Sequence, residues 1–209
     1  MVDLSKLSLK VLVANHCRML VALIGFLLSF LSLISPFCKT TILIAIGPPG
    51  ATVTNYYWAF KWEVHISSNY LNPASLMEYW FCGFWQGAFS NYFHSVSIVP
   101  VSLFIFQVLT VAFSIVSVFV KNRILSYLPI ALSSYTLALM VIVSNLLFQE
   151  MIPPHTNIFG IPNFGEYQLG YYLLYPSIAL FITAFLLNEW VKREQSNIPK
   201  QIDFHGETK

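Results

Sequence analysis

The chain has 209 residues, of which 56% are hydrophobic and 10% charged, and its formal net charge is +2. An ordinary soluble domain has about 25% charged residues, so these charges are too few to cover a water-soluble protein, and the net charge is too small for a nucleic-acid partner. The composition therefore excludes a soluble enzyme, a nucleic-acid-binding protein and a disordered chain, and indicates an integral membrane protein in contact with the lipid bilayer.

The N-terminal part of the chain combines a basic segment with an apolar run. Residues 1–18 contain Lys6, Lys10 and Arg18, and residues 19–37 form the first predicted transmembrane span. A helix of roughly 20 residues crosses about 30 Å of hydrocarbon. A cleaved signal peptide is the alternative. The basic segment favours it, but the length of the run and the lack of an A-x-A-like site do not.

Residues 38–97 form a segment too long for a simple loop, and its pattern predicts β-structure. Residues 41–46 are mostly β-branched or aliphatic, and residues 47–50 read Gly-Pro-Pro-Gly, a turn signal. Residues 54–66 alternate with a period of two, which predicts one half-buried strand. The predicted inner face then holds Tyr56, Trp58, Phe60, Trp62, Val64 and Ile66, and the opposite face holds Tyr57, Ala59, Lys61, Glu63 and His65. The two runs predict a β-hairpin in a small antiparallel sheet.

The pattern changes after Asn72 and Pro73. Ser75 and Glu78 have the spacing of a capping box, which predicts a short helix. An aromatic-rich run follows. One interpretation is an interfacial belt or a local core, since tryptophan and tyrosine favour the membrane surface. The other is a partner-contact surface, because aromatic residues dominate binding hot spots. The candidate contact residues are Trp58, Trp62, Trp80, Phe84 and Trp85.

Three more spans complete the predicted fold. They cover residues 98–120, 124–148 and 169–191, and only residues 121–123 separate the second span from the third. Residues 149–168 are expected to form an irregular loop that packs against the hairpin. The expected fold class is an all-α bundle of four transmembrane helices with a small β-rich extracellular domain between the first two.

The basic residues indicate how the chain crosses the membrane. Three lie in residues 1–18, two in residues 121–123 and four in the tail, residues 192–209, which makes nine of the eleven. Cytoplasmic segments of membrane proteins carry an excess of Lys and Arg. We therefore expect a multi-pass protein of the cell membrane with both termini in the cytoplasm, and with residues 38–97 and 149–168 outside.

Little in the sequence suggests reactive chemistry. Cys38 and Cys82 both fall in the outer segment, where an oxidising exterior permits a disulfide; two buried thiols are the alternative. Cys17 beside Arg18 is a candidate for palmitoylation. His65 could meet His94, with Glu63 or Glu78, at a metal site, but a structural role is favoured. No nucleotide, metal or catalytic motif is present, so we expect neither a cofactor nor an enzyme.

The predicted spans also give no sign of transport chemistry. None carries Asp, Glu, Lys or Arg near its centre, where ion and proton pathways usually place such groups. Gln107, in the second span, is expected to hydrogen-bond a neighbouring helix.

The layout resembles the claudin-like tetraspan superfamily, whose first outer segment carries a W…GLW…C…C signature. Here Trp58 and Trp62 precede the run EYWFCGFW, which contains Cys82 and Trp85. The order differs, since Gly83-Phe84-Trp85 replaces G-L-W and the cysteine precedes that tryptophan. The resemblance covers the whole chain as topology and only a few residues as motif. It implies an adhesion, barrier or accessory-subunit role.

Three functions remain open. The leading hypothesis is a non-enzymatic membrane scaffold whose outer sheet and aromatic surface bind a second copy or another integral membrane protein. The second is a small accessory subunit of a membrane respiratory or redox complex. The third is a claudin-like pore whose charge preference is set by Lys61 with Glu63 or Glu78.

Overall fold

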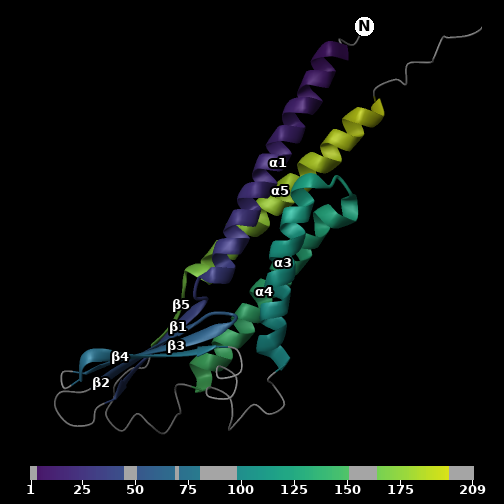
Figure 1. Ribbon diagram of the computed structural model, residues 1–209. Helices are drawn as coiled ribbons and strands as arrows, with labels where there is room; N and C mark the ends of the chain where they lie inside the picture. Colours follow the sequence, from purple (N-terminus) through teal and green to yellow (C-terminus); the bar gives the residue numbers. More distant parts are fainter. Residues whose placement is uncertain (1–3, 45–50, 69–70, 81–97, 151–163, 198–209) are drawn as a thin grey trace, which may run out of the picture.

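Four long helices dominate the computed structural model, which describes residues 4–44, 51–68, 71–80, 98–150 and 164–197 (Figure 1). The helices are α1 (Leu4–Ile34), α3 (Ile98–Phe119), α4 (Arg123–Glu150) and α5 (Leu169–Asn197). Each contains a stretch long and apolar enough to cross a membrane. The four long apolar helices predicted from the sequence are therefore confirmed.

The helices pack as two antiparallel pairs, α1 with α5 and α3 with α4 (Figure 1). The pairs join because α1 also packs against α3, and α4 against α5. Gly25 brings α1 close to α5, since a Cβ at this position would lie 2.7 Å from the Phe181 ring. At the same interface the hydroxyls of Ser29 and Ser177 lie 2.6 Å apart. Small residues thus allow the two longest helices to pack closely.

Gln107 has the role expected from the sequence. Its side chain is buried in the bundle, and its Nε2 donates to Ser32 Oγ on α1 at 3.2 Å. Ser32 Oγ in turn donates to the Gly170 carbonyl on α5 at 2.6 Å. The interhelical hydrogen bond is confirmed, and it extends into a chain that links three helices.

Arg18 lies within α1, which already begins at Leu4. Its side chain is 2% exposed, and its guanidinium donates to the Ser117 and Val118 carbonyls, each at 3.1 Å. These carbonyls belong to the last turn of α3, where helical hydrogen bonds run out. The sequence places Arg18 at the end of the N-terminal segment, and the structure adds that its side chain is buried between α1 and α3.

A five-stranded antiparallel sheet lies at the end of the bundle opposite the start of α1 and the end of α5 (Figure 1). Its order is β4-β3-β2-β1-β5. The strands are β1 (Cys38–Ile44), β2 (Ala51–Tyr57), β3 (Lys61–Ser68), β4 (Leu71–Trp80) and β5 (Phe164–Tyr167). The predicted small antiparallel sheet is confirmed, and β5 adds part of residues 149–168, which we had expected to be an irregular loop.

The single strand predicted over residues 54–66 is in fact two strands. The chain reverses direction between β2 and β3, and the Trp58 amide donates to the Lys61 carbonyl across the turn at 2.9 Å. Tyr56 then pairs with Glu63, and Tyr57 with Trp62. Paired residues share a face of a sheet, so Tyr56 lies with Glu63 rather than with the predicted inner residues.

The helix predicted from Ser75 and Glu78 is wrong. Both residues lie in β4, where Ser75 pairs with Ile66 and Glu78 with Glu63. Local signals for a helix are weak compared with tertiary context. Here β3 pairs with residues 75–80 and with Leu71 of this segment, across a register shift.

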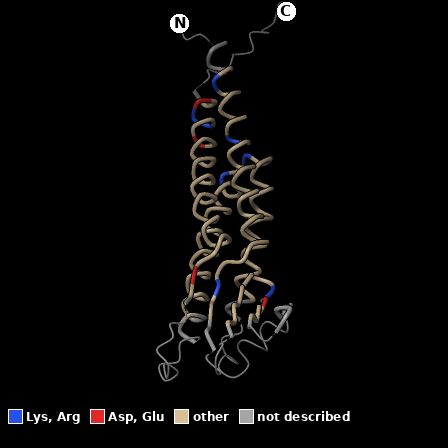
Figure 2. The backbone as a smooth tube through the Cα atoms, turned by 90° about the vertical axis from the view of Figure 1, so that its left-hand side faces the viewer, with Lys and Arg blue, Asp and Glu red and all other residues tan. Residues whose placement is uncertain are grey.

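The charged residues gather at the two ends of the described structure (Figure 2). One group lies near the termini and the other on the sheet, and most of the helical length between them carries none. This is the distribution that a bilayer-spanning protein requires.

Candidate interaction surface

One face of the sheet is buried against the helices. Cys38, Thr40, Asn55 and Tyr57 on this face are all 2% exposed or less. Asn55 Nδ2 donates to Thr40 Oγ1 at 3.2 Å, and the Tyr57 hydroxyl lies 3.5 Å from the same oxygen. Cys38 and Tyr57 belong to one hydrophobic core with residues of α3, α4 and α5. The sheet is thus a continuation of the bundle and not a separate domain.

Burial controls the ionisation of this face. Loss of hydration raises the pKa of the Cys38 thiol above its usual range, against a smaller opposing effect of the nearby Ser144 side chain. Burial likewise raises the pKa of Tyr57, with a hydrogen bond to Thr40 opposing the shift and Cys38 adding to it. Both groups are therefore neutral near pH 7, so neither adds a buried charge between the sheet and the bundle.

Cys38 is a free thiol in this structure. Its predicted disulfide partner, Cys82, lies outside the described residues, so the pairing stays a prediction. Cys17 is exposed on α1, where the possibility of palmitoylation remains open.

The opposite face of the sheet carries charges. Lys39 on β1 and Glu166 on β5 form an ion pair at 3.5 Å. On β3, Glu63 contacts Lys61 through one carboxylate oxygen and His65 Nε2 through the other, the latter at 3.4 Å. The Lys61, Glu63 and His65 side chains alternate along one strand and so share this face. We call Lys39, Lys61, Glu63, His65 and Glu166 the charged face.

Trp58 is the one candidate aromatic residue whose side chain the structure describes. Trp58 is 8% exposed, and its Nε1 donates to the Ile34 carbonyl at the end of α1 at 3.1 Å. Lys61 Nζ lies 4.2 Å from the centre of the Trp58 ring, a cation–π contact. Trp58 therefore belongs to the local core, the first of the two interpretations.

The other four candidates remain undecided. Trp62 lies in β3 and Trp80 in β4, but their side chains are not described. Phe84 and Trp85 lie outside the described residues.

A cluster of tyrosines at the junction of β5 and α5 was not anticipated. Tyr167 stacks on Tyr171 with ring centres 4.1 Å apart, and its hydroxyl donates to Asn145 Oδ1 on α4 at 3.4 Å. The Tyr171 and Tyr175 hydroxyls also contact each other. Tyr171 and Tyr175 lie four residues apart on α5, and this helical spacing could have revealed their contact, whereas Tyr167 lies in β5.

Of the four residues of the metal-site alternative, Glu63 lies beside His65 on β3 and pairs with Glu78 on β4. His65 contacts Glu63, while His94 lies outside the described residues. Within the described part of the chain, no group of three His, Cys, Asp or Glu residues could hold a metal ion.

The chain was compared with known proteins. No protein-family model matches it, and no curated protein is similar to it.

Proposed function

We propose that the protein is a multi-pass membrane scaffold without enzymatic activity, and that its sheet binds a second copy of the chain or another integral membrane protein. The observation that carries the proposal is the five-stranded sheet itself. One of its faces packs on the apolar helices α3, α4 and α5, and the other presents the charged face. A rigid sheet at the end of a bundle offers a contact surface that loses little entropy on binding.

The sheet joins strands from two connections, the one between α1 and α3 and the one between α4 and α5. Cys38 of β1 pairs with Tyr57 of β2 on one side and with Tyr167 of β5 on the other. In addition, the Gln168 amide donates to the Phe37 carbonyl at 3.0 Å. Backbone hydrogen bonds therefore hold two distant segments in one ordered surface. We take this order as support for a binding role, because loops that only connect helices would require few such hydrogen bonds.

The proposed orientation places both termini in the cytoplasm and the sheet outside the cell membrane. The start of α1, the end of α5 and the connection between α3 and α4 lie toward one end of the bundle, and the sheet lies at the other (Figure 1). Nine of the eleven Lys and Arg residues belong to the former end by sequence. The positive-inside rule makes that end cytoplasmic.

The topology also supports our proposal that the chain is a claudin-like tetraspan protein. A pore function for such a protein receives less support. Lys61 and Glu63, the residues expected to set its charge preference, neutralise each other in an ion pair. Free charges are what usually select ions in a pore.

Photo-cross-linking from the sheet tests the scaffold. Thr54 lies between Thr41 and His65, on the charged-face side of β2. A benzophenone amino acid at Thr54 should cross-link, in the native membrane, to a second copy or to an integral membrane protein identified by mass spectrometry. The same group at Ile105, 48% exposed on α3, is the control and should give less product. A monomer without adducts from Thr54 would contradict the proposal.

A further inference from the structure

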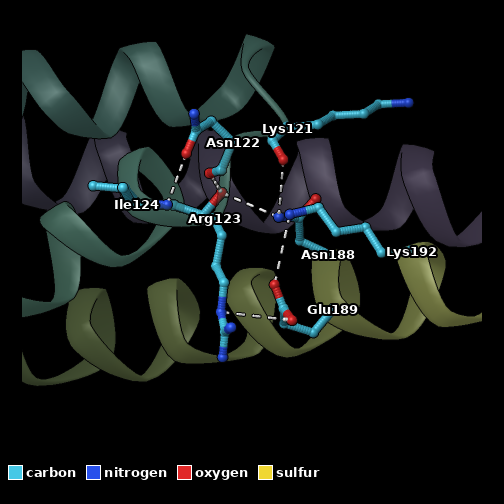
Figure 3. Close-up of polar contacts among 8 residues, drawn as sticks. Lys121, Asn122, Arg123, Ile124, Asn188, Glu189 and Lys192 are labelled. Carbon is cyan, nitrogen blue, oxygen red and sulfur yellow. Dashed lines mark hydrogen bonds and ion pairs between the residues drawn. The ribbon is translucent and has the colours of Figure 1, made fainter.

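The turn between α3 and α4 is tied to α5 (Figure 3). Asn188 on α5 is buried, and its Nδ2 donates to Ser126 Oγ at 3.3 Å and to the Lys121 carbonyl at 3.5 Å. Asn122 Oδ1 caps the start of α4 by accepting the Ile124 amide at 2.8 Å. These bonds fix the backbone on both sides of Arg123.

The charges around this turn are not balanced. Glu189 on α5 accepts ion pairs from Arg123 Nε at 3.8 Å and from Lys192 Nζ at 3.6 Å. Lys121, in the turn itself, adds a third cation whose side chain points away from Glu189 (Figure 3), so Lys121, Arg123, Glu189 and Lys192 together carry a net charge of +2. Arg193 and Glu194 follow on α5 and cancel each other. The cluster can therefore accept an anion.

Arg123 is the cation that is best placed to do so. Its side chain is 73% exposed, and it contacts Glu189 through Nε. The two terminal nitrogens point away from Glu189 (Figure 3) and have no partner among the described residues. A guanidinium with two free N–H groups matches the oxygens of a phosphate.

An apolar groove begins beside this guanidinium. It has a volume of about 360 Å³ and is lined by Arg123, Ile124, Tyr127 and Phe185, so it lies between α4 and α5. Its aromatic walls meet edge to face, with the Tyr127 and Phe185 ring centres 6.1 Å apart. Apart from Arg123 and the Tyr127 hydroxyl, these walls offer hydrocarbon surface.

We propose that this groove binds an anionic phospholipid. The phosphate lies on the terminal nitrogens of Arg123, and the first part of an acyl chain lies along Ile124, Tyr127 and Phe185. Basic pockets between helices on the cytoplasmic side of a membrane bind anionic headgroups in this way. The apolar walls favour a lipid over free phosphate, since free phosphate gains nothing from burying hydrocarbon. This inference rests on the proposed membrane function.

Native mass spectrometry in detergent tests the site with phosphatidylglycerol and phosphatidylcholine as probes. Phosphatidylglycerol should bind more tightly. Arg123→Gln should weaken its binding roughly fivefold, because one basic residue near an anionic headgroup contributes about 1 kcal/mol. Arg193→Gln is the matched control, as it removes the same charge from an exposed position on α5, and should change binding less than twofold.

Further variants and a competitor separate the contribution of the lipid phosphate from that of the acyl chain. Arg123→Lys keeps the positive charge but lacks the two terminal N–H groups of the guanidinium, so it should recover only part of the lipid binding. Tyr127→Ala removes an aromatic ring from the groove and should also weaken lipid binding. Glycerol phosphate, which has the headgroup chemistry without acyl chains, should not displace the lipid. Displacement by glycerol phosphate, equal binding of the two lipids, or equal loss in Arg123→Gln and Arg193→Gln would each overturn the proposal.

Membrane insertion is measured first with vesicles of phosphatidylcholine alone. Extraction of the chain from these vesicles by alkaline carbonate would contradict the proposed function. Retention of the chain, together with equal binding of the two lipids, would contradict only the lipid site. The melting temperature of Arg123→Gln in phosphatidylcholine should match that of the unmodified chain, which shows that lost binding is not lost folding.

Discussion

Arg18 has a role that its place in the sequence did not indicate. A buried guanidinium without a carboxylate partner is costly, yet here it meets the carbonyl end of α3, where the helix dipole is negative. Its Nε has no hydrogen-bond partner among the described residues, and the side chain lines a cavity of about 10 Å³. That volume is close to the space one water molecule needs. Arg18 thus joins α1 to α3 by capping a helix to which it does not belong.

Replacing Arg18 by methionine should lower the free energy of unfolding by about 2 kcal/mol. The change leaves the Ser117 and Val118 carbonyls without donors, and an unsatisfied buried acceptor costs about 1–3 kcal/mol. Both residues are buried, so water cannot easily replace the guanidinium. Arg18→Lys should restore part of the loss. Chemical unfolding in mixed micelles measures the effect.

Lys10→Met serves as the control for this series, because Lys10 is exposed on the same helix. It should change the free energy of unfolding by less than about 0.5 kcal/mol. Equal losses in Arg18→Met and Lys10→Met would contradict the capping role.

Cys38 and Tyr57 make the stability depend on alkaline pH. Burial raises the pKa of both groups above their unfolded values of 9.0 and 10.0. The folded state therefore keeps its protons at a pH where the unfolded chain loses them. The associated stability is complete below about pH 9 and is lost as the pH rises toward the folded pKa values.

Melting temperatures between pH 8 and pH 11 should accordingly fall, and the fall should be smaller in a Cys38→Ala, Tyr57→Phe variant. Identical curves for the two proteins would show that other groups control the alkaline transition. N-ethylmaleimide at pH 8 adds a check, since Cys38 should react only after denaturation. A thiol that still fails to react until reductant is added would indicate the disulfide with Cys82.

The elements differ in how far the sequence could predict them. Long apolar runs and period-two alternation depend on local composition, so the helices and the β-character of residues 38–97 could be predicted. The reversal at Trp58 could not, because residues 54–66 alternate without interruption and only the pairing of Tyr56 with Glu63 reveals two strands. The strand at Ser75 similarly depends on the neighbouring edge of β3. Tertiary partners, which no local window contains, decided both.

The junction of α1 and α5 depends on Gly170. A Cβ at this position would lie 2.7 Å from the Ser35 carbonyl oxygen, 2.8 Å from that of Pro36 and 3.0 Å from that of Ser32. The Gly170 amide also donates to the Pro36 carbonyl at 2.9 Å. The end of α1 and the start of α5 are therefore in backbone contact, which fixes how β1 and β5 meet.

Gly170→Ala should reduce the free energy of unfolding by about 1–3 kcal/mol, the usual cost of overpacking. The added Cβ would meet backbone carbonyl oxygens, which cannot move away as a flexible side chain can. Gly25→Ala is the comparison, since its Cβ would meet the Phe181 side chain, which can adjust more easily, and the loss should be smaller. Unfolding in mixed micelles compares the two variants, and an unchanged Gly170→Ala protein would contradict the close contact.

At the scale of the molecule, charge and topology are consistent with each other. The sheet pairs β1 with β5, although Ile44 and Phe164 are 120 residues apart in the sequence, and this pairing could not be predicted from residues 149–168 alone. The five strands then lie at one end, and the basic turn between α3 and α4 lies at the other (Figures 1 and 2). A chain built in this way has two chemically different ends, which a membrane would keep in different compartments.

Cysteine labelling in intact cells tests this separation. In a chain whose three cysteines are replaced by alanine, Glu166→Cys places a thiol on the sheet at a side chain that is 58% exposed. Arg193→Cys places one at the opposite end, on exposed α5. An impermeant maleimide should label the first in intact cells and the second only after permeabilisation, because the bilayer excludes the reagent from the cytoplasm. The reverse pattern would invert the proposed orientation. Labelling of both thiols in intact cells would mean that no bilayer separates the two ends, which would contradict the four membrane crossings themselves.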